Sequence, residues 1–332
     1  MKEPTLHDVF KVSWKLTIRH KALWILGLGA LVFGQLGLLD VITGVVKGVV
    51  PGKNISLGSQ LTYLYSPHTM AAIGNALHYS FDSWAAFAWL LTIIFVLGAM
   101  FVIMAAISQG GIVHAAALSM EHGMKSIEKF HESWHAGARS ASQVLLLNIL
   151  KKCILFAISL IVGASALASM VYGTASSAIL FIICFISSLI VGMTVSMLTI
   201  FAVGYLIIEK KSLFDSLAHA WKLFVKHWLV ACEVGVILLV CNILVVALLC
   251  AGLYIFVAPS LALNAYGALI GSAAISQFGV SMAIVLFLAY AAIIGSIFTV
   301  FVTTSWTYLF VIMHEWGIKS RIHTWIESFK RK

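Results

Sequence analysis

The sequence predicts an all-α integral membrane protein, a polytopic six-helix transmembrane bundle that forms one domain over residues 1–332. Composition is the first indication: 61% of the residues are hydrophobic, only 10% are charged, and the mean hydropathy is +1.04. Soluble domains carry about 25% charged residues, so this chain has too little polar surface to cover a soluble core. The other two indications are six apolar stretches of membrane-spanning length and an uneven distribution of lysine and arginine.

The six apolar stretches are each long enough to cross a bilayer as a helix, which takes about 20 residues. They lie near residues 22–40, 84–107, 151–172, 178–207, 228–257 and 280–312. The segment "GTASS" at 173–177 predicts a tight hairpin between the third and fourth spans. None of the four prolines lies within a predicted span, so no proline kink is expected.

The basic residues indicate how these spans are oriented. Every lysine and arginine except Lys47 and Lys53 falls within residues 1–21, 109–152, 208–227 or 313–332. Cytoplasmic loops of membrane proteins collect Lys and Arg, so both termini are predicted to lie in the cytoplasm. The net charge of +9 is then explained by membrane topology, and we expect no nucleic-acid partner.

A threefold repeat precedes the odd-numbered spans and is centred on Trp14, Trp134 and Trp221. Four residues before each tryptophan stands a large apolar residue, and five residues after it stands a cation. The apolar set is Phe10, Phe130 and Leu217, and the cations are Arg19, Arg139 and Lys226. Apolar residues at this spacing beside cations are typical of an amphipathic helix that lies in the membrane interface.

The repeat therefore predicts three cytoplasmic interfacial helices, at about 5–20, 126–140 and 212–226, each leading into a helical hairpin. Their membrane anchors are expected to be Phe10, Trp14, Phe130, Trp134, Leu217 and Trp221. Each cation near the inner leaflet contributes about 1 kcal/mol of attraction to anionic headgroups. Membrane lipids are thus the predicted partners, whereas the sequence identifies no protein partner.

Three segments resemble a broad family of bacterial six-span membrane proteins that includes the membrane domain attached to some glycerophosphoryl diester phosphodiesterases. They are "FKVSWKLTIRHKALWILG" from Phe10, "SQGGIVHAAAL" from Ser108 and "SLFDSLAHAWKLFVKHW" from Ser212. The resemblance implies a bacterial inner membrane protein. It does not imply the phosphodiesterase activity, which belongs to a separate soluble barrel domain.

One motif suggests metal chemistry. Residues 131–135 read His-Glu-Ser-Trp-His, the H-E-x-x-H pattern in which two histidines on one helix face bind zinc and the glutamate activates water. Such a site needs a third protein ligand, and no second ligand motif follows. The repeat offers another explanation, because His135 occupies the position of Lys15 and Lys222.

Polar residues within the spans suggest a different function, since such groups mark transport paths when they face a cavity. The candidates are Asp40, Glu233 and Asn242, with Asn148 near the start of the third span. Lys151 and Lys152 are expected to extend back to the interface. The five cysteines lie in apolar runs, and we expect inert thiols rather than disulfides or metal ligands.

These observations favour a non-enzymatic membrane protein, without cofactor, that acts in membrane organisation, lipid contact or support of a partner complex. The alternative is a small-molecule or lipid transporter. A second alternative is a zinc metalloprotease acting through His131, Glu132 and His135.

Overall fold

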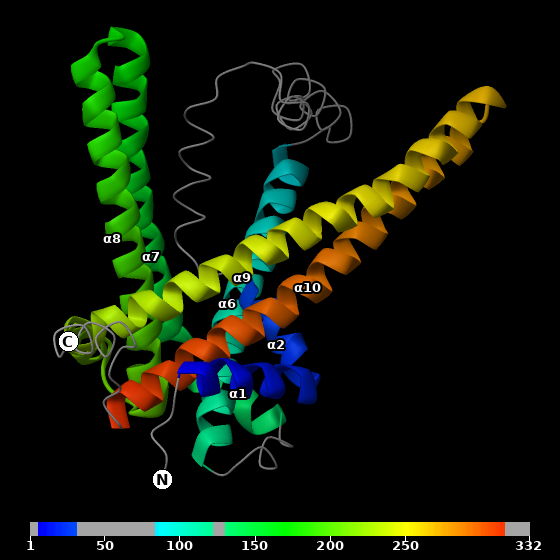
Figure 1. Ribbon diagram of the computed structural model, residues 1–332. Coiled ribbons are helices and arrows are strands. Elements are labelled where there is room, and N and C mark those ends of the chain that lie inside the picture. The colour runs from blue at the N-terminus through cyan, green and yellow to red at the C-terminus, as the bar shows by residue number, and fades with distance from the viewer. Residues whose placement is uncertain (1–5, 32–83, 122–129, 316–332) are drawn as a thin grey trace, which may run out of the picture. The chain divides into compact units, whose positions relative to one another are not determined.

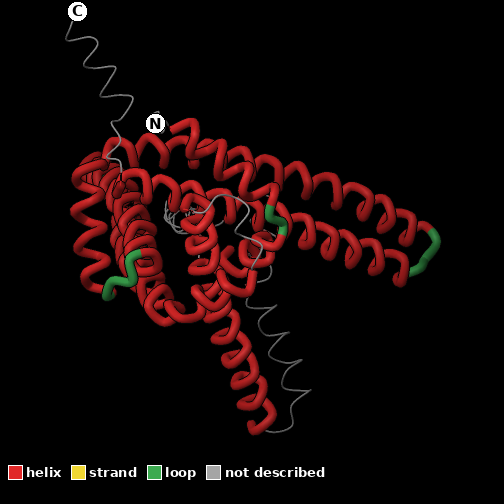
Figure 2. The backbone as a smooth tube through the Cα atoms, turned by 90° about the horizontal axis from the view of Figure 1, so that it is seen from below, coloured by secondary structure: helices red, strands yellow, loops and turns green. Residues whose placement is uncertain are grey.

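The computed structural model describes residues 6–31, 84–121 and 130–315 (Figure 1). They form seven helices: α1 (Leu6–Arg19), α2 (Ala22–Ala30), α6 (Trp84–Glu121), α7 (Phe130–Tyr172), α8 (Ala175–Ile208), α9 (Leu213–Leu269) and α10 (Ala273–Glu315). Figure 2 shows helices joined by short turns, and the described residues contain no strand. The prediction of an all-helical chain is confirmed over these residues.

Five of the described helices, α6 to α10, are long and apolar enough to cross a membrane, as expected of a multi-pass membrane protein. They contain the second to sixth predicted spans. Of the first predicted span, at 22–40, the structure describes α2 and Leu31, while the rest lies outside the described residues. The count of six spans therefore stays a prediction.

Helix α7 joins two segments that the sequence analysis treats separately. The interfacial helix expected at 126–140 and the span expected at 151–172 form one continuous helix from Phe130 to Tyr172. The residues between them contain neither Gly nor Pro, so nothing in that stretch breaks the helix. The helix predicted at 5–20, in contrast, is a separate element, α1.

Helix α9 contains a break at the predicted place. His227 has non-helical dihedral angles, φ −127° and ψ 26°, at the boundary between the interfacial helix predicted at 212–226 and the span predicted at 228–257. At its other end α9 continues beyond that span to Leu269, and Pro259 lies inside the helix. Pro259 thus lies beyond the predicted span, and the non-helical dihedral angles inside α9 are at His227 rather than at this proline. The turn to α10 follows at Gly271, whose φ is +69°.

The chain divides into two compact units. The described part of unit 2 comprises residues 84–102 and 152–193. Within it, α7 and α8 form an antiparallel hairpin, in which Leu155 and Val162 pack against Phe181 and Phe185. The turn is at Gly173, with φ +59°, so the predicted hairpin at 173–177 is confirmed. Most other apolar side chains of this hairpin are exposed, as expected of surfaces that contact lipid.

Unit 1 comprises residues 6–31, 103–121, 130–151 and 194–315 of the described chain. Its core is formed by the C-terminal segments of α6, α8 and α10. Phe201 of α8 packs edge-on against Trp306 of α10, and Ser119 of α6 is hydrogen-bonded to the Tyr308 hydroxyl of α10. A Cβ on Gly110 of α6 would lie 3.5 Å from Ile207 of α8. Each core helix thus contacts the other two.

The three repeat helices, defined as α1, residues 130–140 of α7 and residues 213–226 of α9, pack around this core. Trp14 of α1 packs edge-on against Phe301 of α10, and His219 of α9 lies against Tyr205 of α8, with ring centroids 5.6 Å apart in both pairs. Helix α7 approaches α6 so closely that a Cβ on Gly137 would lie 2.7 Å from the Gly111 nitrogen. These three contacts are made with α10, α8 and α6, respectively.

Candidate functional site

The repeat helices bury the same position, and it is not the tryptophan. The residue just before each tryptophan is Ser13, Ser133 or Ala220, and all three are buried. Small side chains there let each repeat helix approach the core. Trp14 and Trp221 are each 53% exposed, which is compatible with their predicted role as membrane anchors.

The side chains of the other predicted anchors that the structure describes are less exposed to solvent. Trp134 is half-buried and packs against an apolar cluster formed by α1, α2, α6 and α10. Phe10 and Leu217 are half-buried as well. For Phe130 the structure describes the backbone alone.

A second face is exposed in all three repeat helices. The positions three before, one after and five after the tryptophan lie one helical turn apart and form a stripe along the helix. All nine side chains of these stripes are exposed. The stripes are Lys11, Lys15 and Arg19 on α1; His131, His135 and Arg139 on α7; and Ala218, Lys222 and Lys226 on α9. We call them the basic stripes.

The histidines of the H-E-x-x-H motif belong to the second basic stripe. His131 Nε2 and His135 Nε2 are 3.1 Å apart, and their ring centroids are 4.2 Å apart. Glu132 is exposed on the adjacent face of the helix. Among the described residues, no group of three or more His, Cys, Asp and Glu side chains could hold a metal ion. The structure thus shows two of the three protein ligands that a zinc protease requires.

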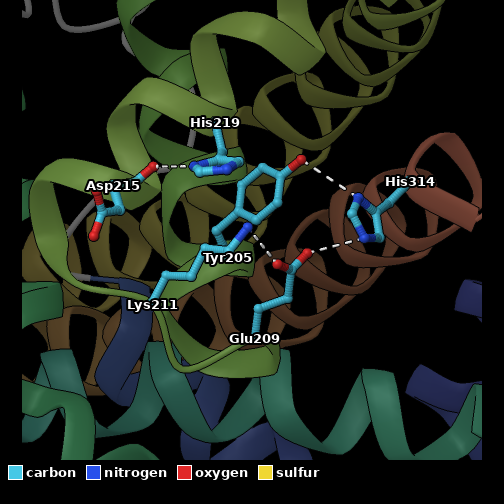
Figure 3. Close-up of polar contacts among 6 residues, drawn as sticks. All are labelled: Tyr205, Glu209, Lys211, Asp215, His219 and His314. Atoms are coloured by element: carbon cyan, nitrogen blue, oxygen red, sulfur yellow. Dashed lines mark hydrogen bonds and ion pairs between the residues drawn. The ribbon is translucent and has the colours of Figure 1, made fainter.

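A cluster of polar side chains connects the ends of α8 and α10 in unit 1 (Figure 3). Glu209 is at its centre, with one carboxylate oxygen 2.7 Å from Lys211 Nζ and the other 3.0 Å from His314 Nε2. The Tyr205 hydroxyl lies 3.4 Å from Nδ1 of His314. These contacts connect the last turn of α8 with the last turn of α10.

The start of α9 extends the same cluster. Ser212 donates a hydrogen bond to the Asp215 carboxylate at 2.6 Å, and its own hydroxyl accepts one from the Asp215 amide. This arrangement caps the helix N-terminus. Lys210, with φ +53°, adopts the left-handed conformation that turns the chain from α8 into α9. His219 Nδ1 lies 2.7 Å from the Asp215 carbonyl oxygen, so its ring is held beside Tyr205.

No motif in the sequence predicts this cluster as a site. Glu209 and His314 are 105 residues apart, and no local pattern connects them. The available signal was weaker: charged residues at the ends of two predicted spans that share one predicted side of the membrane. Chemically the cluster offers ion pairs and hydrogen bonds, and its one serine, Ser212, is engaged in capping α9. It is suited to holding helix ends together.

A second polar contact lies deeper in unit 1. The Asn148 side chain of α7 donates a hydrogen bond to Gln109 Oε1 of α6 at 2.7 Å and another to its own helix at Val144. Both amides are buried, and Lys151, one turn further along α7, is only 4% exposed. Lys151 is thus enclosed by protein, whereas the Lys152 side chain is exposed. That these side chains extend to the membrane interface stays a prediction.

The structure describes two of the other predicted intramembrane polar residues, and both lie on α9. Glu233 and Asn242 are both half-buried on α9, and the Oδ1 atom of Asn242 has no hydrogen-bond partner among the described residues. Asp40 lies outside the described residues. All five cysteines are free thiols.

Comparison with known proteins adds no relative: no protein-family model, curated protein or solved structure matches the chain.

Proposed function

We propose that this chain is a non-enzymatic inner membrane protein that binds anionic lipid headgroups through its basic stripes, with both termini in the cytoplasm. Membrane organisation or support of a partner complex follows from such contacts. The family resemblance carried by the repeat supports this reading, because it indicates a membrane domain rather than a catalytic one.

The exposure pattern of α1 is the observation that carries the proposal. Its buried face, formed by Val9, Ser13 and Leu16, is occupied by the protein core. Its exposed face combines Trp14 with the cations of the first basic stripe. A surface of tryptophan beside lysine and arginine matches the boundary between acyl chains and headgroups.

The test measures how far anionic lipid stabilises the purified full-length protein. Wild-type protein in detergent is titrated with phosphatidylglycerol or phosphatidylcholine, and the midpoint of thermal unfolding is followed. A ligand that binds the folded state raises that midpoint. We expect a larger rise with phosphatidylglycerol, and a decrease of this difference at high salt, where exposed charges are screened.

A matched pair of variants locates the effect. Replacing Lys15 and Lys222 by glutamine removes one cation from each of two stripes, and we expect a loss of about 2 kcal/mol of lipid stabilisation. The control replaces Lys47 and Lys53, which are predicted to lie on the opposite side of the membrane. If both variants respond to phosphatidylglycerol as the wild type does, the basic stripes are not the lipid contact.

Transport is a second candidate, favoured by the burial of Lys151 beside Asn148 and Gln109. Ionisable side chains within membrane spans are rare and mark ion or proton paths. The test is proton flux into proteoliposomes loaded with a pH-sensitive dye. Flux that is abolished by Lys151→Gln, and is unaffected by Lys152→Gln, would favour a proton path over the lipid-contact function. Equal flux in liposomes without protein would exclude that path.

A further inference from the structure

We propose that His131 and His135 form a surface site for a first-row divalent transition-metal ion, bound by the two Nε2 atoms. The two histidines are one turn apart on α7, and both rings are exposed. Their Nε2 atoms are 3.1 Å apart. Both potential ligand atoms therefore already lie close to one point in solvent.

The separation of the two nitrogens fits a shared ion. Imidazole nitrogens bind zinc at about 2.0–2.1 Å. Two ligands at that distance are about 2.9 Å apart if they subtend a right angle at the metal, and about 3.4 Å apart at the tetrahedral angle. The observed 3.1 Å lies between these values, so only small side-chain rotations are needed for binding.

An ion bound between the two rings would replace the hydrogen bond that joins them. At 3.1 Å the two nitrogens form a hydrogen bond, which requires one ring to carry a proton on Nε2 and the other to present a lone pair. When a metal ion binds, the neutral ring that carried its proton on Nε2 carries it on Nδ1 instead, and both Nε2 atoms then act as ligands. Binding must therefore weaken as the pH falls and protons compete for the rings.

The number of ligands sets the class of ion and its affinity. Among the described residues no third His, Cys, Asp or Glu joins the pair, so water fills the other positions. Imidazole suits copper, nickel and zinc, and affinity follows the order Cu²⁺ above Ni²⁺ and Zn²⁺. The site is open and exchangeable, unlike the three-ligand centre of a zinc protease.

The position of the pair in the repeat suggests what the ion does, an inference that rests on the proposed lipid contact. In the first basic stripe Lys11 and Lys15 occupy the equivalent positions, and in the third Lys222 replaces His135. A bound divalent ion would place positive charge where the sister helices carry lysine. Metal loading would then strengthen the contact of the second stripe with anionic headgroups.

The experiment uses the full-length protein, purified with a tag that contains no histidine. Ni²⁺ alone is titrated by calorimetry, because nickel does not oxidise the five thiols. We expect one ion per chain to be bound with higher affinity than any other. Loss of either ring should weaken binding about a hundredfold, since the second ligand no longer acts intramolecularly.

Two single variants and a control separate this site from adventitious binding. His131→Gln and His135→Gln should each abolish the high-affinity event, whereas His7→Gln, at another exposed histidine, should leave it unchanged. Cu²⁺ bound to the wild type should show coupling to two nitrogens in its paramagnetic resonance spectrum. Binding that survives both single variants, or that disappears equally in His7→Gln, would overturn the site. Zinc that resists chelators would also overturn it, in favour of a closed three-ligand centre.

The link to lipid contact has its own readout. Ni²⁺ should raise the phosphatidylglycerol stabilisation of the wild type, but not that of a His131→Lys, His135→Lys variant, which carries permanent cations there. If Ni²⁺ binds without changing the lipid response, the metal site stands and its link to the proposed function fails.

Discussion

Replacing Gly137 by alanine tests the closest helix contact in unit 1. A Cβ at this position would lie 2.7 Å from the Gly111 nitrogen and 3.1 Å from the Ile107 carbonyl carbon, and would overlap the Ile107 oxygen. Cβ atoms essentially never approach other atoms closer than 3.0 Å. All the contacted atoms belong to the α6 backbone, so a side-chain rotation cannot relieve the clash, and α6 and α7 must move apart.

The magnitude is worked out by comparison with Gly163 on the same helix. A Cβ on Gly163 would meet nothing within 4 Å among the described residues. Alanine is favoured over glycine in a helix by about 1 kcal/mol, and this gain is common to both substitutions. Overpacking a close contact costs about 1–3 kcal/mol. We therefore expect Gly137→Ala to be about 1–3 kcal/mol less stable than Gly163→Ala.

The assay is reversible unfolding of the purified protein in mixed micelles by increasing sodium dodecyl sulfate. The free energy of unfolding is extrapolated for the wild type and both variants, and size-exclusion chromatography confirms that each is monodisperse beforehand. If Gly137→Ala is as stable as Gly163→Ala, α6 and α7 are not in backbone contact at Ile107 and Gly111, and the arrangement of the second repeat helix on its core helix is refuted.

Three further outcomes are expected. Asn148→Leu should lower the free energy of unfolding by about 1 kcal/mol, because it leaves Gln109 without its buried donor. The double variant Asn148→Leu, Gln109→Leu should lose less free energy of unfolding than the sum of the two single variants. Strict additivity would argue against a hydrogen bond between the two side chains. Glu209→Gln should cost under about 1 kcal/mol, because its ion pair with Lys211 is partly exposed to solvent, and the cost should disappear in high salt; a larger, salt-independent loss would contradict this account. Green fluorescent protein fused after Lys332 should fluoresce in cells, because it folds in the cytoplasm, and a dark but expressed fusion would reverse the predicted topology.

The break at His227 and the continuity of α7 show that local sequence does not predict where a helix is interrupted. Both segments contain the same repeat, followed by an apolar run, and the sequence analysis treats them alike. In the structure the second repeat helix continues straight into its span, whereas the third is interrupted at His227. Neither junction contains glycine or proline, so the residues that most disfavour a helix do not distinguish the two junctions.

The cluster around Glu209 could not be predicted from local sequence either, because its members lie on different helices. The contact between the Glu209 carboxylate and His314 Nε2 joins the ends of α8 and α10, which meet only because α8, α9 and α10 pack together. Asn148 was a candidate because a polar residue in an apolar run is conspicuous. Its partner Gln109 lies on another helix, and only the α6–α7 contact identifies it.

The sequence by itself determined that this protein is helical, that its helices are long and apolar enough to span a membrane, and that a tryptophan-centred repeat precedes three of them. Composition and periodicity are local properties, and each of these conclusions depends on nothing else. Only the tertiary structure decided which face of each repeat helix meets the protein. The buried residues are Ser13, Ser133 and Ala220, one position before tryptophans that the pattern makes more conspicuous. The physical reason is that lipid is as apolar as a protein core, so hydrophobicity alone cannot distinguish a face that packs on protein from one that packs on lipid.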